Sequence, residues 1–119
     1  MDTHDLNSPA GIATLYFDCW RAGDPEPLRP YLSPDVTFDG VLGSTHGPED
    51  FLRGLTAMFA ATDSLQIRLR LADERDAVTW SELRMDGKEP VEVANWTHVE
   101  DGVITAVRVT FDPRPLFAA

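Results

Sequence analysis

The sequence predicts an α+β domain in which helices pack on a strongly curved, mostly antiparallel sheet. Amphipathic helical patterns are concentrated in the first half of the 119 residues, whereas the second half alternates apolar and polar residues as strands do. The clearest strand pattern lies on both sides of Asp101-Gly102, a pair typical of tight hairpin turns. Helices followed by a run of strands indicate that the helices collect on one face of the sheet.

Two helices are expected before the first strand. The first begins at Ser8-Pro9, because serine is a favoured N-cap and proline fits the first helical position. It ends at Gly23, since glycine readily adopts the left-handed conformation that closes a helix. The second helix is short; it starts at Asp24-Pro25 and is terminated by Ser33-Pro34.

A strand, a loop and a third helix are expected next. The strand covers residues 35–39, and residues 40–46 are expected to form a glycine-containing loop. The third helix begins at Gly47-Pro48 and ends near Thr62. Stripes of methionine and aromatic residues on a helix usually pack in the core, and we expect this of Phe51, Leu52, Leu55, Met58 and Phe59.

Four antiparallel strands are expected to complete the sheet. The first has one apolar face, formed by Leu65, Ile67, Leu69 and Leu71. The second covers residues 77–85 and turns at Asp86-Gly87 into the third, which starts after Pro90. The last two strands form the hairpin around Asp101-Gly102.

Asn95 is a polar residue in the middle of an apolar strand face. The two-residue repeat of a strand places it with Val91, Val93, Thr97 and Val99. The same repeat predicts one face for Val103, Thr105, Val107, Val109 and Phe111 of the last strand. An amide in this position is either a core residue bonded to the backbone or part of a functional site, and the pattern leaves both interpretations open.

The opposite face of these strands carries charged residues and two tryptophans, Trp80 and Trp96. Aromatic residues and arginines concentrate at subunit interfaces. We therefore expect a homodimer formed through this outer face of the sheet. Two exposed tryptophans that shield each other are the alternative interpretation.

Composition excludes several classes of partner and cofactor. The net charge of −10 argues against nucleic acid or an anionic membrane as a partner. Zinc-type Cys/His spacing, a phosphate-binding glycine loop and a serine nucleophile elbow are all missing from the sequence. No metal and no cofactor are therefore expected, and any chemistry must use ordinary side chains.

Length and cysteine content predict the organisation of the chain. Residues 1–119 are expected to form one domain, with residues 1–7 mobile. No apolar run approaches the roughly 20 residues needed to cross a bilayer. A single cysteine, Cys19, and no recognisable signal segment predict a cytoplasmic location.

Local patterns between Tyr16 and Phe111 together resemble the nuclear-transport-factor-2-like superfamily. They are Tyr16-x7-Asp24 with a preceding glycine, Asp35-Val-Thr-Phe, His46-Gly47-x-Glu49 and the closing Asp-Gly-x-Ile hairpin. The resemblance implies a cone-shaped α+β barrel, the fold shared by ketosteroid isomerases, SnoaL-like polyketide cyclases and scytalone dehydratase. It implies much less about the reaction.

Within the superfamily the sequence is most similar to the ketosteroid isomerases, which move a proton next to a carbonyl group. This resemblance implies that Tyr16 and Asn95 are the two hydrogen-bond donors of an oxyanion hole. The position of the catalytic base falls on Gly40, so that the neighbouring Asp39 becomes the candidate base. Asp39 faces the pocket only if the strand bulges at Gly40; otherwise it is a solvated carboxylate at the strand end.

The pocket implied by the resemblance is apolar. Its predicted walls are Trp20, Phe38, Leu55, Met58, Phe59, Val93, Val107 and Phe111. His46, in the predicted loop, is either a ligand contact at the mouth or a surface residue.

These observations lead to three hypotheses about function. The first is an acid–base isomerase, cyclase or dehydratase acting on a small hydrophobic carbonyl compound such as a polyketide, steroid or terpenoid. The second is a non-catalytic module that binds a hydrophobic ligand or only dimerises, which the missing base at Gly40 favours. The third is a module that recruits other proteins, although no extended docking segment supports it.

Overall fold

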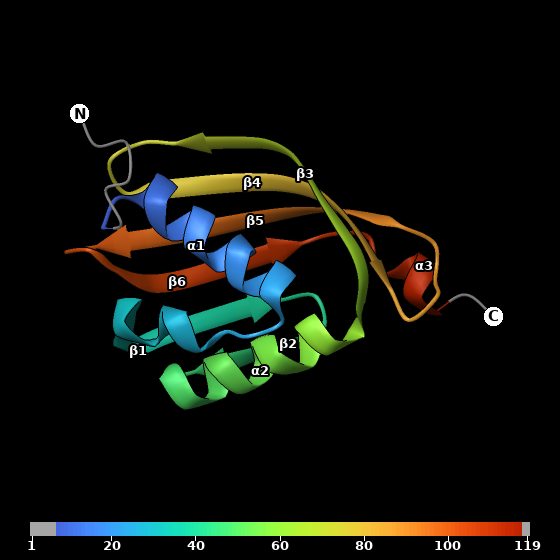
Figure 1. Cartoon of the computed structure of the whole chain (residues 1–119), viewed down its shortest axis with the longest axis horizontal. Coiled ribbons are helices and arrows are strands. Elements are labelled where there is room, and N and C mark those ends of the chain that lie inside the picture. Colours follow the sequence, from blue (N-terminus) through green and yellow to red (C-terminus); the bar gives the residue numbers. More distant parts are fainter. Residues whose placement is uncertain (1–6, 118–119) are drawn as a thin grey trace.

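A computed structural model describes residues 7–117 (Figure 1). The elements in chain order are α1 (Pro9–Ala22), the 3-10 helix η1 (Glu26–Tyr31), β1 (Leu32–Gly40), β2 (Gly43–His46), α2 (Pro48–Ala61), β3 (Thr62–Ala72), β4 (Asp76–Met85), β5 (Val91–Glu100), β6 (Val103–Thr110) and α3 (Arg114–Phe117). The sequence predicted that residues 1–7 are mobile, and residues 1–6 of this segment lie outside the described range. No helix within the described range is long and apolar enough to cross a membrane.

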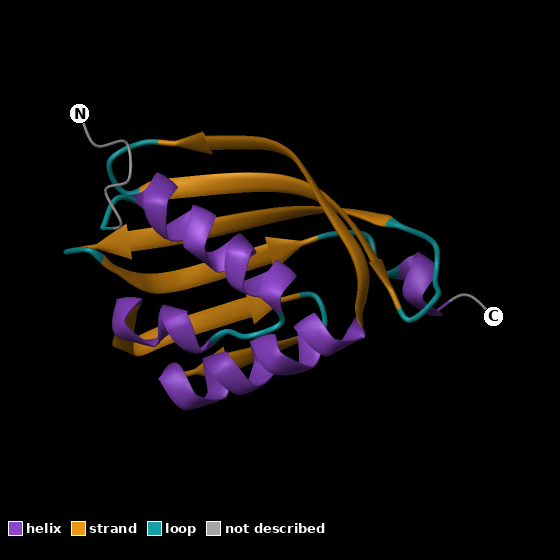
Figure 2. Cartoon of the chain, in the orientation of Figure 1, coloured by secondary structure: helices purple, strands orange, loops and turns teal. Residues whose placement is uncertain are grey.

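The predicted α+β class is confirmed. Six strands form one sheet in the order β2-β1-β6-β5-β4-β3, and the pairing is antiparallel except between β1 and β6. Both long helices, α1 and α2, lie on the same side of this curved sheet (Figure 2). The core lies between them and the sheet, where α1 buries Ile12, Tyr16 and Phe17.

The predicted helix ends and hairpin turns are present. The side chain of Ser8 accepts a hydrogen bond from the Gly11 amide at 3.1 Å, and Gly23 closes α1 at φ 75°. The residues of both Asp-Gly turns adopt positive φ, with Asp101 at 52° and Gly102 at 78°. These turns fix which strand faces meet, because a hairpin turn sets the register of its two strands.

The sequence-based prediction of a loop at residues 40–46 is wrong in its second half. Residues Gly43–His46 form β2, which pairs with β1 from Thr37↔His46 to Gly40↔Gly43. Four residues without an apolar alternation carry no strand signal of their own. They become a strand because they satisfy the backbone groups along the free edge of β1.

The prediction of one apolar face for β3 is also wrong, because the strand contains a bulge. Its pairing with β4 shifts between Ile67 and Leu69, so that the side chains beyond the shift change faces. Leu69 is 54% exposed and Leu71 63% exposed. Arg70 turns inward instead, and its Nε donates a hydrogen bond to Thr79 Oγ1 at 2.9 Å.

A second register shift changes the predicted face of β6. His98 pairs with Ala106 and Val99 with Ile104, so that Thr105 is an extra residue in the strand. Ile104 is therefore buried, whereas Val103 is only half-buried. The alternation expected from Val103 onward holds only after this bulge.

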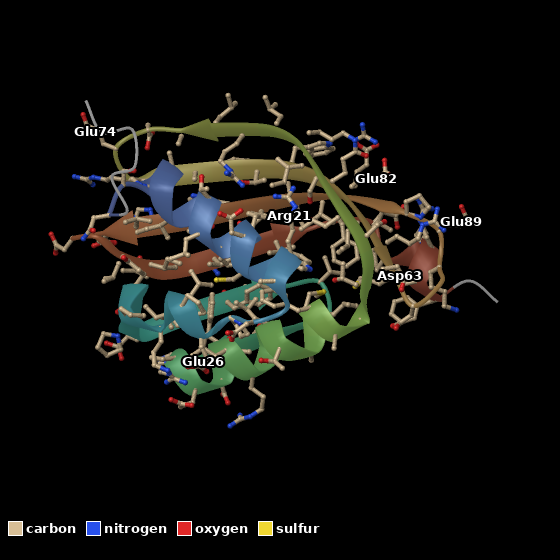
Figure 3. The ribbon with its side chains drawn as sticks, in the orientation of Figure 1. Arg21, Glu26, Asp63, Glu74, Glu82 and Glu89 are labelled. Atoms are coloured by element: carbon tan, nitrogen blue, oxygen red, sulfur yellow. The ribbon has the colours of Figure 1, made fainter. Side chains whose placement is uncertain are left out.

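The outer face of the sheet carries aromatic and charged residues, as predicted. The indole of Trp80 donates a hydrogen bond to Glu92 and that of Trp96 to Asp76, both at 2.7 Å. Glu82, which Figure 3 shows at the periphery of the β3–β4 side, forms an ion pair with Arg68. Polar groups on this face are thus largely paired with one another.

Candidate functional site

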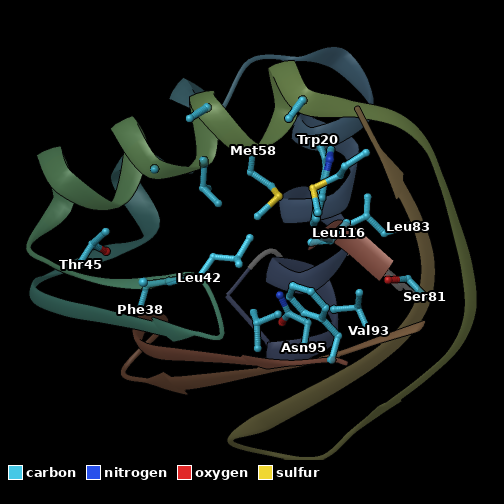
Figure 4. A pocket seen from close by; sticks show the side chains of 18 of the residues that line it. Trp20, Phe38, Leu42, Thr45, Met58, Ser81, Leu83, Val93, Asn95 and Leu116 are labelled. Carbon is cyan, nitrogen blue, oxygen red and sulfur yellow. The ribbon is translucent and has the colours of Figure 1, made fainter. Parts of the chain in front are cut away.

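A cavity of about 530 Å³ lies between α1, α2 and the inner face of the sheet (Figure 4). Its volume falls within the roughly 300–1,000 Å³ common for small-molecule sites. Most of its walls are apolar side chains of α1, α2, β1 and β4–β6, and the short helix α3 lies at its mouth. Such a cavity favours a ligand that is itself mostly hydrophobic.

The structure brings Tyr16 and Asn95 together in this cavity. Tyr16 projects from α1 and Asn95 from the middle of β5, and they are 1% and 2% exposed. Burial strongly raises the pKa of the Tyr16 hydroxyl, and a hydrogen bond with the Asn95 side chain opposes this only in part. The hydroxyl is therefore protonated at neutral pH and can act as a hydrogen-bond donor.

Aromatic rings hold Tyr16 in place. Its ring lies 5.3 Å from that of Phe17 and 6.4 Å from that of Phe51, the second pair being edge to face. Phe51 in turn contacts Phe38 edge to face at 6.1 Å. The hydroxyl is thus positioned by packed rings from two helices and one strand.

Asp39, the candidate base, lies outside the cavity. It accepts a hydrogen bond from Ser44 Oγ at 2.8 Å and forms an ion pair with Arg108 on the outer side of the sheet. The bulge that would turn it inward does not form, because Asp39 pairs regularly with Ser44 and Gly40 with Gly43. Asp39 therefore has the solvated position that the sequence left open as the alternative.

The ring of Phe38 lies next to residue 40, the position where the resemblance implied a catalytic base. A Cβ atom on Gly40 would lie 2.8 Å from Cε1 of Phe38, closer than real Cβ contacts allow. Phe38 lines the cavity and so occupies the space that a side chain on residue 40 would need.

The other predicted wall residues divide into two groups. Those that line the cavity are Trp20, Phe38, Leu55, Met58, Val93 and Phe111. Phe59 and Val107 are buried in the core but do not line it, and His46 is exposed on β2 away from it. His46 does not lie at the predicted position at the mouth, because residues 43–46 form the edge strand β2.

Sequence reasoning did not anticipate the rim of the cavity. It is formed by Leu42 between β1 and β2, by Asp86 and Lys88 after β4, and by Leu116 and Phe117 of α3. Lys88 could have been singled out from the sequence, because it is the only lysine and follows an Asp-Gly turn. Asp86 is the only carboxylate among the described lining residues, and it is exposed.

Within residues 7–117, no group of three or more histidine, cysteine, aspartate or glutamate side chains could hold a metal ion.

Comparison with solved structures shows the fold that the sequence patterns suggested. The steroid delta-isomerase of Pseudomonas aeruginosa is 19% identical with a TM-score of 0.82, over 98% of this chain and 88% of that one. An NTF2-like protein of unknown function from Cytophaga hutchinsonii is 22% identical with a TM-score of 0.81, over 93% and 96% of the two chains. A de novo designed protein with a curved β-sheet is 20% identical with a TM-score of 0.78, over 96% and 90%.

These likenesses establish the fold and leave the activity open, since the same fold occurs in an isomerase and in a designed protein. No curated protein matches the chain. The model of the SnoaL-like domain matches residues 13–107, which is most of the sequence. The resemblance noted from the sequence is therefore confirmed, and the chain belongs to the SnoaL-like domain family.

Proposed function

We propose that the protein binds a small hydrophobic carbonyl compound, with the carbonyl oxygen held at Tyr16 and Asn95. The observation that carries this proposal is a buried, protonated tyrosine beside a buried amide in a mostly apolar cavity. Hydrogen-bond donors are costly to bury without an acceptor. A carbonyl oxygen supplies the acceptor, and the apolar walls accommodate the hydrocarbon part of a polyketide, steroid or terpenoid.

Isomerase, cyclase or dehydratase chemistry on the same ligand is a second candidate. Two donors in a water-poor site would stabilise the enolate that forms when a proton leaves the carbon next to a carbonyl. With Asp39 on the outer face, the carboxylate available to such chemistry among the described lining residues is Asp86 at the rim. Catalysis therefore requires a ligand whose acidic carbon reaches toward the mouth.

The binding proposal is tested with a methyl naphthyl ketone and the ethyl naphthalene of matched size. Trp20 lines the cavity, so its fluorescence reports binding of either probe. Tyr16→Phe is expected to weaken the ketone about tenfold and to leave the hydrocarbon unchanged, because a net hydrogen bond contributes about 1 kcal/mol or somewhat more.

Equal loss for both probes, or a ketone that binds the native protein no tighter than the hydrocarbon, would contradict the proposal. Catalysis is tested separately, by exchange of the ketone's methyl protons in heavy water. Exchange that Asp86→Asn abolishes supports the second candidate, and exchange no faster than in buffer excludes it for this ketone.

We also propose that the outer sheet face pairs with a second copy of the chain. The bulge in β3 leaves a contiguous apolar patch across three strands, formed by Leu69, Leu71, Val78, Trp80 and Trp96. At its borders the ion pairs Arg68–Glu82 and Arg108–Asp39 neutralise charge within the face. A second copy would therefore cover apolar area whose charged borders are partly neutralised, despite a net charge of −10 on each chain.

Leu71→Asp is expected to convert a dimer into a monomer, because it places a carboxylate on the most exposed side chain of the apolar patch, at 63% exposure. Sedimentation velocity at micromolar concentration measures the change. Val41→Asp is the matched control, since Val41 is also exposed but lies on the β1–β2 turn. A native chain that sediments as a monomer at about 100 times that concentration would refute the pairing.

A further inference from the structure

Thr97, the next residue on the same strand face, orients the Asn95 amide. Thr97 is 1% exposed, and its hydroxyl donates a hydrogen bond to Asn95 Oδ1 at 2.9 Å. Thr97 does not line the cavity, whereas Asn95 does. Any influence of Thr97 on a ligand must therefore pass through Asn95.

An asparagine side chain presents an acceptor at one end and two donor hydrogens at the other. The end that faces a ligand decides whether the site takes an acceptor or a donor. With Oδ1 engaged by Thr97, the nitrogen is the end left for Tyr16 and the cavity. Because Tyr16 shares a hydrogen bond with the Asn95 side chain, the amide nitrogen is then the atom that donates to the Tyr16 oxygen.

We propose that Thr97 is a positioning residue that makes the polar group of the cavity a donor-only site, selective for a carbonyl over the corresponding alcohol. The hydrogen bonds then run in one direction: Thr97 donates to Asn95, one N–H of Asn95 donates to Tyr16, and the other N–H of Asn95 and the Tyr16 hydroxyl are left to donate to the ligand. An alcohol can accept from Tyr16, but in this chain of donors its own O–H meets only oxygens that already accept a hydrogen bond. This inference rests on the proposed carbonyl-binding function and specifies the ligand class further.

The neighbouring strands support a fixed orientation. Thr97 lies in the middle strand of three, opposite Ala77 of β4 and Val107 of β6, and both of these residues are buried. Thr79, opposite Asn95, is already engaged by Arg70. The Thr97 hydroxyl is therefore the group on β5 that holds the amide oxygen.

The test compares the methyl naphthyl ketone with the alcohol obtained by its reduction. In the native protein the ketone is expected to bind about tenfold tighter, since an unsatisfied buried hydroxyl costs about 1–3 kcal/mol. Thr97→Val keeps the shape but removes the hydroxyl, and it is expected to reduce the preference to about twofold or less. Thr97→Ser, which restores a hydroxyl, is expected to recover the preference.

The carbonyl stretching frequency of the bound ketone is the readout that a merely structural role would not move. It is expected to shift toward its value in an apolar solvent in Thr97→Val and to return in Thr97→Ser. Unchanged preference and frequency in Thr97→Val, while Tyr16→Phe still weakens the ketone, would overturn the role of Thr97 alone. A native protein that binds neither probe would overturn the proposed function and this inference with it.

Discussion

Replacing Phe17 by alanine is expected to lower the free energy of unfolding by about 3–5 kcal/mol, the usual cost of truncating a buried aromatic residue. Phe17 is 1% exposed, its ring stacks on Trp20 at 5.6 Å, and the guanidinium of Arg70 lies 5.2 Å from its centroid. The truncation removes both contacts at once. It also takes away the apolar cover of a half-buried arginine. Urea unfolding followed by far-ultraviolet circular dichroism measures the change.

The loss would be a large share of the total stability, which is about 5–15 kcal/mol for a domain. Phe17→Leu is the matched control, because it retains apolar volume beneath Arg70 and should cost clearly less. A loss below about 1 kcal/mol for Phe17→Ala would mean that the contacts between α1, Trp20 and Arg70 do not form the core described here.

Replacing Met58 by tryptophan is expected to weaken binding of the ketone about 10- to 100-fold by filling the cavity. Met58 is half-buried on α2 and its side chain points into the cavity (Figure 4). Binding then becomes less favourable by about 1–3 kcal/mol, the usual strain of overpacking, because the ligand has to displace the inserted ring. Titration of Met58→Trp with the ketone measures the loss, and circular dichroism verifies that the variant is folded.

Met58→Leu is the control, since it conserves volume and should bind the ketone within about threefold of the native protein. The expected loss is steric, so the ketone and the hydrocarbon should weaken equally in Met58→Trp. This distinguishes it from Tyr16→Phe, which affects the ketone alone. Unchanged affinity in Met58→Trp would place the ligand somewhere other than this cavity.

Much of the fold could be predicted from short-range signals. Ser8, Gly23 and the two Asp-Gly turns each act through their own backbone conformation, so the sequence reports them directly. The face of β3 could be predicted only up to its bulge, and that of β6 only beyond its bulge. A bulge reverses the alternation after it, and the extra residue arises from pairing with a strand elsewhere in the chain.

The residues of the candidate site could likewise be predicted only in part. Asn95 could be found because it interrupts an apolar face, and its partner Tyr16 because of the resemblance to the isomerases. The outward position of Asp39 depends on its regular pairing with Ser44 of β2, a strand with no sequence signal. The rim at Asp86 and Leu116 also escaped prediction, because turns and chain ends carry no periodicity that would aim them at a cavity.

The contact between Phe38 and Gly40 has a consequence for how this family member can change over evolutionary time. An aspartate introduced at residue 40 alone would collide with the Phe38 ring, whereas trimming Phe38 alone would open a void against Phe51. The two positions are epistatic, because the space open to a side chain at residue 40 is set by the ring at residue 38. Substitutions at residues 38 and 40 are therefore expected to be non-additive, because a change at one position alters the free-energy cost of a change at the other.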